Sequence, residues 1–279
     1  MSRSGEGADG GKEAGRGRSA DLERIRDALD AAAEAVRPFT PGDVAFDRKE
    51  ARGDPVTEAD HAADRVLRAI LPRDGEGWLS EESADDPSRL DCRRVWVVDP
   101  IDGTREFVEG LPEWCISIGL LEDGLPVAGG IYNPATDEMV IGSLETGVEY
   151  NGSAARVTEP PGGLREGQVS VLASRSEVRR GEWERFEGGP FDIRACGSVA
   201  FKMALVAAGR VDATWTLVPK SEWDVAAGTA LVRAAGGVVT LADGREPAFN
   251  KPKPTFPNFV AAGRTLGALL VDDWLQTTP

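Results

Sequence analysis

The sequence predicts an α/β protein, a layered sandwich in which an α+β half is followed by an α/β half. Two observations lead to this prediction. Apolar residues first recur every three or four positions and then gather in short β-rich runs between residues 94 and 142. From residue 169 onward, strand-like and helix-like segments alternate. Alternating helices and strands bury their apolar faces as stacked layers.

Two amphipathic helices are predicted first. One follows Ser19 and stops at Pro38, and its apolar residues are spaced by threes and fours. The next begins after Thr57, a suitable N-cap residue, and runs to Leu71, which precedes a proline. Asp60 lies on or beside the apolar stripe of this second helix. An unpaired charge would be costly there, so we expect Asp60 to have a partner.

Short β-rich runs come next and predict an antiparallel meander. Each run is short enough for a strand, and turn-forming pairs such as Asp123-Gly124 and Asn133-Pro134 separate them. The predicted strands are residues 95–98, 114–121, 127–132 and 139–142.

The rest of the chain alternates between the two types of element. Apolar β-branched runs predict strands, and segments with apolar residues at helical spacing predict helices. The strands are expected at 169–173, just before Cys196, at 211–216 and, with a hairpin, at 238–244. The helices are expected near Trp183, at 199–208 and from Asp224 to the Gly236-Gly237 pair, where Asp224 would be the N-cap.

The chain divides into a tail and two halves. Residues 1–18 are dominated by Gly, Ser and charged residues, and they bury too little surface to offset the entropy of ordering, so we expect a disordered tail. A soft boundary near residues 150–160 separates an α+β half, 19–155, from an α/β half, 156–279. The 279 residues of the whole chain suffice for a sizeable hydrophobic core.

Composition narrows the class of function. The formal charge of -15 disfavours a nucleic-acid polymer or an anionic membrane surface as partner. We find neither a signal peptide nor a membrane span. The three cysteines form no C-x-x-C pair, which favours a reducing, cytoplasmic location. With one histidine, His61, a metal site would have to use oxygen ligands.

Four acidic strings occur at positions that structural roles alone do not explain well. In the strongest, the apolar strand Trp96–Val98 runs directly into Asp99-Pro100-Ile101-Asp102-Gly103-Thr104. The two carboxylates and the Ile101 carbonyl can converge on one hard cation such as Mg²⁺. The other strings are Asp54 to Asp60, Ser80-Glu81-Glu82-Ser83 and Trp223 to Gly228, which contains Asp224.

Each string alone also has an ordinary explanation. Asp102 would cap an Asp-Gly turn, Glu81 and Glu82 would be solvated, Asp224 would cap a helix, and Asp60 would face back at Thr57 in a capped helix start. A structural account becomes weak only when all the strings are taken together. Like charges about 4 Å apart repel by roughly 4 kcal/mol at an effective dielectric near 20, so converging carboxylates need cations to coexist ionised.

Taken in their order along the chain, the four strings resemble the inositol monophosphatase family of metal-dependent, lithium-sensitive phosphatases. The resemblance extends from about residue 19 to 265. That family shows D-x-V-T-x-x-D, E-E, W-x-x-D-P-x-D-G-T-x-x-F and W-D-x-A-A-G, all of which occur here. The resemblance implies an α-β-α-β-α sandwich of the sugar-phosphatase type, two or three Mg²⁺ ions and inhibition by Li⁺. It places most of the metal ligands in the first half and the substrate contacts with the last metal aspartate in the second.

The resemblance also assigns roles to single residues. Asp60 and Thr104 match the pair that orients the attacking water, and Glu81 is assigned a catalytic role as well as a ligand role. Glu82 is a candidate for contacting the ligands rather than the metal. The implied metal ligands are Glu81, Asp99, the Ile101 carbonyl, Asp102 and Asp224.

The same resemblance favours the 3'(2'),5'-bisphosphate nucleotidase branch. Glu106 stands in a G-T-R-E-F string that is similar to the G-T-K-E-F of that branch. The strand before Asp224 has Thr216 or Leu217 where inositol enzymes have a glutamate that binds hydroxyls. Against this, Glu177 replaces the histidine of the nucleotidase S-R-S-H string. The candidate substrate contacts are Gly103, Thr104, Ser174, Gly197, Ser198, Lys202 and Lys220, and a second phosphate would need a cation such as Lys220.

The expected function is therefore a Mg²⁺-dependent phosphomonoesterase acting on a small phosphorylated metabolite. Removal of the 3'-phosphate of adenosine 3',5'-bisphosphate is preferred, and hydrolysis of inositol 1-phosphate is the alternative. A non-catalytic protein that binds metal and a phosphorylated ligand is a second alternative, although none of the implied liganding acids is missing. The sequence leaves a homodimer open.

Overall fold

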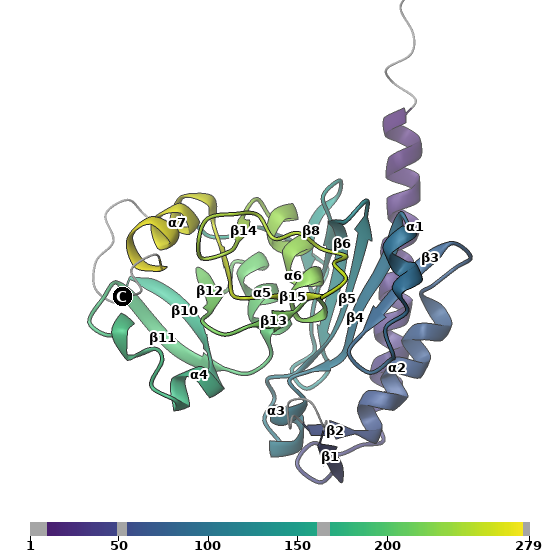
Figure 1. The fold of residues 1–279 in the computed structure, drawn as a ribbon, viewed down its shortest axis with the longest axis horizontal. Helices are drawn as coiled ribbons and strands as arrows, with labels where there is room; N and C mark the ends of the chain where they lie inside the picture. The colour runs from purple at the N-terminus through teal and green to yellow at the C-terminus, as the bar shows by residue number, and fades with distance from the viewer. Residues whose placement is uncertain (1–9, 49–54, 161–167, 276–279) are drawn as a thin grey trace, which may run out of the picture.

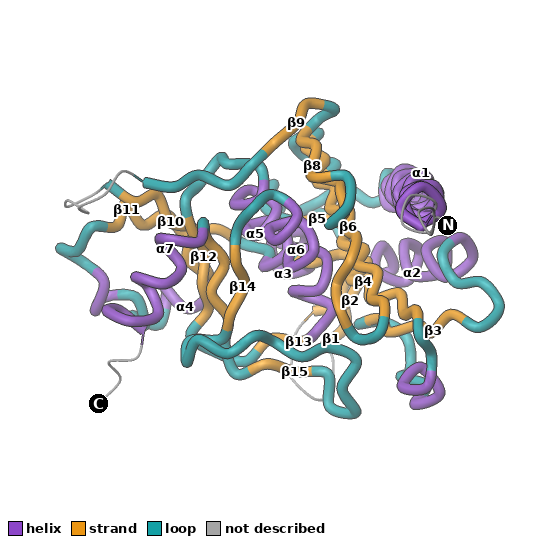
Figure 2. Tube along the Cα trace, turned by 90° about the horizontal axis from the view of Figure 1, so that it is seen from above, coloured by secondary structure: helices purple, strands orange, loops and turns teal. Residues whose placement is uncertain are grey.

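The protein is described by a computed structural model that covers residues 10–48, 55–160 and 168–275. Figure 1 and Figure 2 show five layers in which helices alternate with sheets. The predicted α-β-α-β-α sandwich is therefore confirmed. The helical layers contain α1 (Gly10–Val36) with α2 (Glu58–Ile70), then α5 (Val199–Ala207) with α6 (Glu222–Ala234), and finally α4 (Arg175–Arg179) with α7 (Arg264–Leu269).

A seven-stranded sheet forms the first β layer. Its strands lie in chain order across the sheet, and every pair is antiparallel except β3 and β4, which are parallel. The meander predicted from the β-rich runs is confirmed. The strands are β3 (Glu76–Ser80), β4 (Arg94–Asp102), β5 (Cys115–Glu122), β6 (Leu125–Asn133), β7 (Glu138–Ser143), β8 (Gly147–Tyr150) and β9 (Ser153–Ala155).

A five-stranded mixed sheet forms the second β layer, in the order β11-β10-β12-β16-β14. Strand β10 is parallel to its neighbours β11 and β12, whereas β16 is antiparallel to β12 and β14. The strands are β10 (Val169–Ser174), β11 (Phe191–Cys196), β12 (Ala213–Thr216), β14 (Val238–Thr240) and β16 (Phe259–Ala262).

Small elements complete the fold. Two antiparallel pairs, β1 with β2 and β13 with β15, flank the layers. The remaining elements are β1 (Phe46–Arg48), β2 (Pro55–Thr57), η1 (Pro87–Asp91), α3 (Thr104–Glu109), η2 (Glu184–Phe186), β13 (Lys220–Ser221), β15 (Thr255–Phe256) and the π-helical η3 (Leu270–Leu275).

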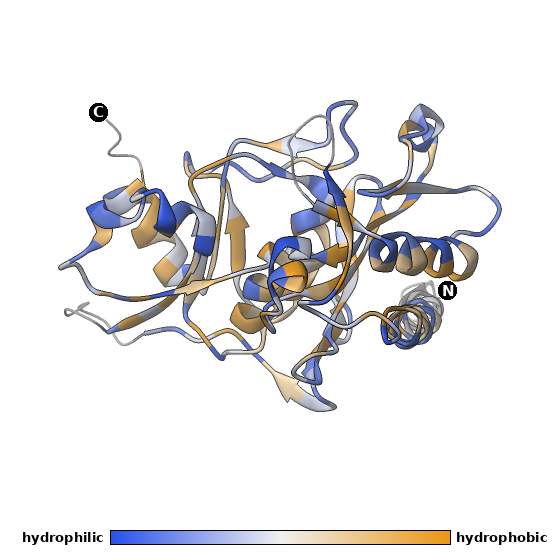
Figure 3. Cartoon of the chain, turned by 90° about the horizontal axis from the view of Figure 1, so that it is seen from below, coloured by the Kyte–Doolittle hydropathy of each residue, from blue (hydrophilic) through white to orange (hydrophobic). Residues whose placement is uncertain are grey.

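Helix α2 forms as its sequence predicts. Thr57 is the N-cap, its side chain accepts hydrogen bonds from the backbone of Ala59 and Asp60, and Asp60 completes a capping box. Leu71 is the C-cap, directly before the proline. Figure 3 shows a hydrophilic and a hydrophobic side on this helix, and its apolar side packs with α1 on the seven-stranded sheet.

Helix α6 lies very close to the seven-stranded sheet. A Cβ atom added to Gly119 or Gly129 would stand 2.9 Å or 2.8 Å from the backbone of Ala227, so only glycine permits this approach. The close packing sets the position of the first turn of α6, which carries Asp224. A helix from the second half of the chain is thereby held against the sheet whose strand β4 carries Asp99 and Asp102.

The first helix corrects the expected boundary of the tail. Residues 10–18, assigned above to a disordered tail, are the first turns of α1, whereas residues 1–9 lie outside the described part of the chain. Arg18 is buried, and its guanidinium pairs with Glu122 at 2.9 Å and Glu145 at 3.0 Å. Local composition gives no indication of these acids, which lie at the end of β5 and in the β7–β8 turn.

Other elements also differ from the prediction. Asp224 is not the N-cap of α6: the helix begins at Glu222, Ser221 is the cap, and Asp224 is the third helical residue. The helix expected near Trp183 is divided into α4 and the short η2, because Gly181, with φ +77, interrupts it. The sequence analysis did not anticipate β3, β16 or α7.

Candidate metal centre

The end of β4 brings acidic residues into the interior. Asp99 and Asp102 are 1% and 8% exposed, and the pairing of β4 with β5 is irregular between them. Gly103 then turns the chain with φ +98, and a Cβ atom there would lie 2.8 Å from the carbonyl oxygen of Glu113. Only glycine fits this turn, which leads directly into α3 at Thr104.

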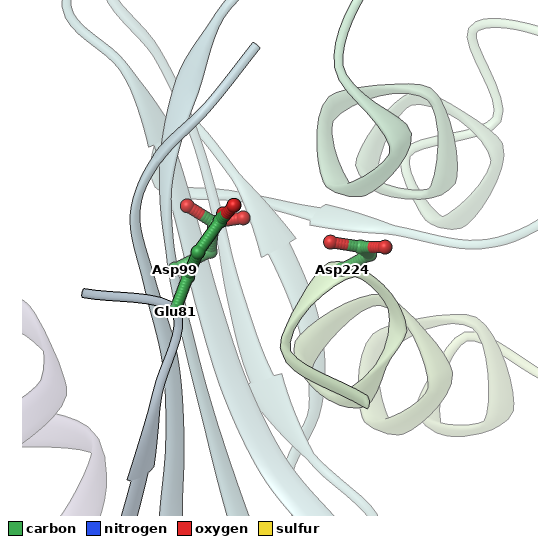
Figure 4. Close-up of side chains that lie close together, drawn as sticks. All are labelled: Glu81, Asp99 and Asp224. Carbon is green, nitrogen blue, oxygen red and sulfur yellow. The ribbon is translucent and has the colours of Figure 1, made fainter. Parts of the chain in front are cut away.

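Three carboxylates meet at this turn. Glu81 follows β3, Asp99 lies in β4 and Asp224 lies in the first turn of α6, and one oxygen of each lies within 4.8 Å of the others. Figure 4 shows the three side chains pointing toward one another between the sheet and the helix. Because β3 and β4 are parallel neighbours, their carboxyl ends reach the same edge of the sheet, which explains why Glu81 joins Asp99.

The electrostatics of this cluster are unfavourable without a cation. Burial, reinforced by the charges of Glu81, Asp102 and Asp224, raises the pKa of Asp99 well above its usual range. Burial and the neighbouring acids likewise raise the pKa of Asp224 to about 8. Asp99 Oδ1 is buried without a hydrogen-bond partner among the described residues. Carboxylate oxygens that lie this close together, with Asp99 Oδ1 lacking a hydrogen-bond partner, fit a hard divalent cation.

Asp102 lies beside this cluster but is bound to α5. Its Oδ2 accepts hydrogen bonds from Ser198 Oγ at 2.7 Å and from the Ala200 amide at 2.5 Å. Burial raises the pKa of Asp102, although these two hydrogen bonds oppose the shift. Both of these hydrogen bonds use Oδ2, so Oδ1 is the atom of Asp102 that would bind a cation. The assignment of Asp102 as a metal ligand stays a prediction.

Asp60 has the partner that its place on the helix required. The Thr104 hydroxyl lies 3.0 Å from Asp60 Oδ1 and 2.9 Å from the Ile101 carbonyl oxygen, and the structure allows it to donate to either. Asp60 Oδ2 accepts from the amide and hydroxyl of Thr57, at 2.8 and 2.6 Å. A hydroxyl has one proton to donate and two lone pairs, so Thr104 can donate to Asp60 and still accept a hydrogen bond from water.

The loop after β3 is held by a residue that the sequence analysis missed. Asp64 lies one turn after Asp60 on α2, and it accepts hydrogen bonds from Ser80 and Ser83, each at 2.6 Å. Ser80 Oγ in turn accepts from the Glu82 amide at 3.2 Å. Asp64 therefore fixes the loop that carries Glu81 and Glu82. The sequence feature that could have indicated this role is its spacing of four from Asp60, which places both acids on one face of α2.

A cavity of about 470 Å³ opens beside the acids. All seven predicted substrate contacts line it: Gly103, Thr104, Ser174, Gly197, Ser198, Lys202 and Lys220. Glu81, Ile101, Asp102 and Asp224 line it too, whereas Asp60, Asp99 and Glu82 are not part of its wall. Residues that the sequence analysis did not propose as contacts also line it, among them Arg105, Glu106, Arg175, Ser176, Arg180 and Cys196.

The two lysines of this cavity differ in what they contact. Lys202 is 3% exposed, and its ammonium donates to the carbonyl oxygens of Ser198, Gly197 and Cys196 at 2.7, 3.2 and 3.5 Å. An ammonium group has three protons, so these contacts occupy its whole capacity. Lys220 has a more exposed side chain, and its Nζ lies 3.9 Å from Glu177 Oε1. Of the two, Lys220 is the better candidate for a substrate contact.

Known proteins share the sequence features of this site. The model of the inositol monophosphatase family matches residues 18–273. The chain belongs to the inositol monophosphatase family. An inositol-1-monophosphatase of Mesorhizobium japonicum is 36% identical over 201 residues, which cover 69% of this chain and 74% of that protein. A fructose-1,6-bisphosphatase/inositol-1-monophosphatase of Thermotoga maritima is 36% identical over 212 residues, covering 74% and 78%.

Solved structures agree with the family assignment. An inositol monophosphatase from Anabaena has a TM-score of 0.77 and 27% identity, and the match covers 94% of this chain and 98% of that one. As a member of the inositol monophosphatase family, the chain is a phosphoric monoester hydrolase, and that family is metal-dependent and uses Mg²⁺. In the part of the chain that the structure describes, we find no helix with the length and apolar character needed to span a bilayer.

Proposed function

We propose that the protein hydrolyses one phosphate ester of a substrate that carries a second phosphate, with adenosine 3',5'-bisphosphate as the preferred candidate. The observation that carries this proposal is the distribution of charge in the cavity. A cluster of acids that fits divalent cations forms one end, and Lys220 forms part of the wall beside it. A bisphosphate presents one phosphate to each.

The acidic residues divide the task of holding the cations. Glu81, Asp99 and Asp224 would bind a shared ion, and Asp102 Oδ1 with the Ile101 carbonyl would complete a set of two or three Mg²⁺ sites. When bound, Mg²⁺ neutralises charge on the phosphate and makes a nearby water more acidic. We expect Li⁺ to inhibit by competing for the same oxygens.

The attacking water is held by Thr104 and Asp60. When the Thr104 hydroxyl donates its proton to Asp60 Oδ1, its oxygen accepts a hydrogen bond from the water. Asp60 is itself fixed by two hydrogen bonds from Thr57, so the pair holds its geometry before substrate arrives. Proton transfer from the water to this pair leaves hydroxide directed at phosphorus, and no covalent enzyme intermediate is needed.

The choice of substrate depends on the cavity wall beside the acids, which includes Lys220 but not Thr216. Thr216 is 3% exposed and its hydroxyl bonds to Glu177, so it offers no acceptor for the hydroxyl groups of inositol. Lys220 provides a cation there instead, which favours an anionic group. Inositol 1-phosphate remains the second candidate, and the names of the Mesorhizobium and Thermotoga relatives favour it.

A panel of phosphate esters tests the proposal. Phosphate release from adenosine 3',5'-bisphosphate, inositol 1-phosphate, fructose 1,6-bisphosphate and adenosine 5'-phosphate is measured with saturating Mg²⁺ and with EDTA. We expect activity only with Mg²⁺ and the highest kcat/KM for adenosine 3',5'-bisphosphate. A higher kcat/KM for inositol 1-phosphate would turn the assignment to the alternative.

The variant Lys220→Met separates the two substrates within one enzyme. A charge-assisted hydrogen bond contributes about 1.5–3 kcal/mol, so its loss should lower kcat/KM for the bisphosphate roughly 10- to 150-fold. Hydrolysis of inositol 1-phosphate should change little, because that substrate has no second phosphate. Equal losses on both substrates would contradict the contact.

A further inference from the structure

Glu177 is a fully buried acid close to the cavity. It lies in the short helix α4, and its side chain is 0% exposed. Its Oε2 accepts hydrogen bonds from Trp183 Nε1 at 3.0 Å and from the Leu217 amide at 3.3 Å, and its Oε1 accepts from Thr216 Oγ1 at 2.5 Å. The carboxylate therefore ties α4 to the end of β12.

Hydrogen bonding alone does not account for a charge at this position. The Trp183, Leu217 and Thr216 donors are neutral. A glutamine here would keep one acceptor oxygen for Trp183 and Leu217, and its NH₂ group could donate to the Thr216 hydroxyl, which would then donate to the Val218 carbonyl oxygen 3.2 Å away. A buried carboxylate is costly unless a cation opposes it. Lys220 supplies that cation, because its Nζ lies 3.9 Å from Glu177 Oε1.

The pair places Lys220 where a substrate can reach it. Lys220 follows the turn Leu217–Pro219, whose first amide Glu177 binds, and it lines the cavity together with Val218 and Pro219. Burial lowers the pKa of Lys220, and the charges of Asp224 and Glu177 oppose that shift. Glu177 thus acts on both the turn and the ammonium group, from outside the cavity wall.

We propose that Glu177 is a positioning residue that holds the Lys220 ammonium in the cavity wall and so makes the enzyme prefer a substrate with a second phosphate over a polyol monophosphate. This inference rests on the proposed function. It adds a residue that touches neither substrate nor metal but determines which substrate fits.

The test measures KM and kcat for adenosine 3',5'-bisphosphate and inositol 1-phosphate at saturating Mg²⁺. The variant Glu177→Gln keeps the shape and an acceptor oxygen but removes the charge. We expect its kcat/KM for the bisphosphate to fall about fivefold or more, through KM, since coupled charges in contact show effects of this order. Its kcat on the bisphosphate and both constants for inositol 1-phosphate should stay within about twofold of wild type.

Trp183→Phe is the matched control. It removes a neutral donor to the same carboxylate but keeps the charge that faces Lys220. We expect a lower melting temperature and an unchanged ratio of kcat/KM between the two substrates. If Trp183→Phe changes this ratio as much as Glu177→Gln does, Glu177 has only a structural role and the inference is wrong.

The double variant Glu177→Gln with Lys220→Met keeps the test decisive if Glu177→Gln alone does not fold, because it removes both buried charges. If Glu177 acts through Lys220, the double variant has the same substrate ratio as Lys220→Met. A further change in the ratio would overturn the inference. Failure of the proposed function is seen separately, in the wild type: no preference for the bisphosphate there refutes both.

Discussion

At the scale of single residues, Asp99 shows why the acidic cluster needs a cation. Its side chain is buried, its Oδ1 lacks a hydrogen-bond partner among the described residues, and three other acids surround it. Such a group is costly when ionised and unpaired. The ligand role that we propose for Asp99 would account for a buried acid at the end of an apolar strand, which stability alone does not.

The variant Asp99→Asn should therefore lose activity without losing its fold. It removes one ligand charge, so phosphatase activity at saturating Mg²⁺ should fall about a hundredfold or more. The metal-free variant should melt at the same temperature as the metal-free wild type or higher, because charge repulsion is relieved. Thermal unfolding in EDTA and a turnover assay measure both quantities. Turnover above roughly a few per cent of the wild-type rate would exclude Asp99 as an essential ligand.

Thr104 differs from the acids because we assign its hydroxyl to the water. Thr104→Ala should lower kcat roughly a hundredfold or more, the usual order for a lost proton-transfer contact. The Mg²⁺ concentration that gives half-maximal activity should change little. Titration of activity with Mg²⁺ separates the two effects, and a large shift in the half-maximal concentration would instead assign Thr104 to the ion.

At the scale of elements, the metal centre depends on contacts that fix loops. The loop after β3 has no regular structure, and Asp64 of α2 holds it through Ser80 and Ser83. The start of α6 is held by the capping box between Ser221 and Asp224. Elements on either side of the cluster thus place the ligands before a cation binds.

Asp64→Ala should weaken metal binding without removing a ligand. The loop that carries Glu81 loses both hydrogen bonds, so we expect the half-maximal Mg²⁺ concentration to rise about tenfold, as for other residues that orient metal ligands. The kcat at saturating Mg²⁺ should remain within about twofold of wild type. Glu58→Ala is the control, because it removes an equal charge from an exposed position of α2. A similar rise in that variant would attribute the effect to charge alone.

Much of this architecture could be predicted from local sequence. Helix α2 was predicted because its cap, periodicity and terminal proline all lie within the segment 57–72, and the meander because its runs are separated by turn pairs. Residues 10–18 were assigned wrongly because Arg18 is buried by acids more than a hundred positions away. The start of α6 was misplaced because either Ser221 or Asp224 is a suitable cap.

Only part of the candidate site could be predicted, because some of its contacts join residues that are far apart in the sequence. The acidic strings are local motifs, and the structure brings Glu81, Asp99 and Asp224 together. Asp64 and Glu177 were missed as functional residues because the partners that give them these roles, Ser80 and Lys220, lie 16 and 43 positions away. Lys202 lines the cavity, but the sequence did not indicate that its ammonium donates to the carbonyl oxygen of Ser198. Such tertiary contacts leave no local pattern.

At the scale of the whole molecule, the acidic cluster links stability to pH and metal. The pKa of Asp224 is about 8 in the folded protein and 3.8 ordinarily, and Asp99 shifts in the same direction. The folded state therefore binds these protons more tightly than the unfolded state does. The free energy of unfolding of the metal-free protein should fall as pH rises above about 4, until Asp224 is fully ionised above about pH 8.

We accordingly expect the melting temperature in EDTA to decrease between pH 5 and pH 8, and Mg²⁺ to raise it more at pH 8 than at pH 5. The cation binds the ionised carboxylates, so at pH 8 it competes with fewer protons. Acids with lowered pKa, such as Glu76 and Glu122, contribute little to this window, because their ordinary pKa of 4.5 already lies below pH 5. Asp224→Asn should flatten both dependences in calorimetry. A wild-type melting temperature that rises from pH 5 to pH 8 in EDTA would show that the cluster does not carry the unfavourable charge inferred for it.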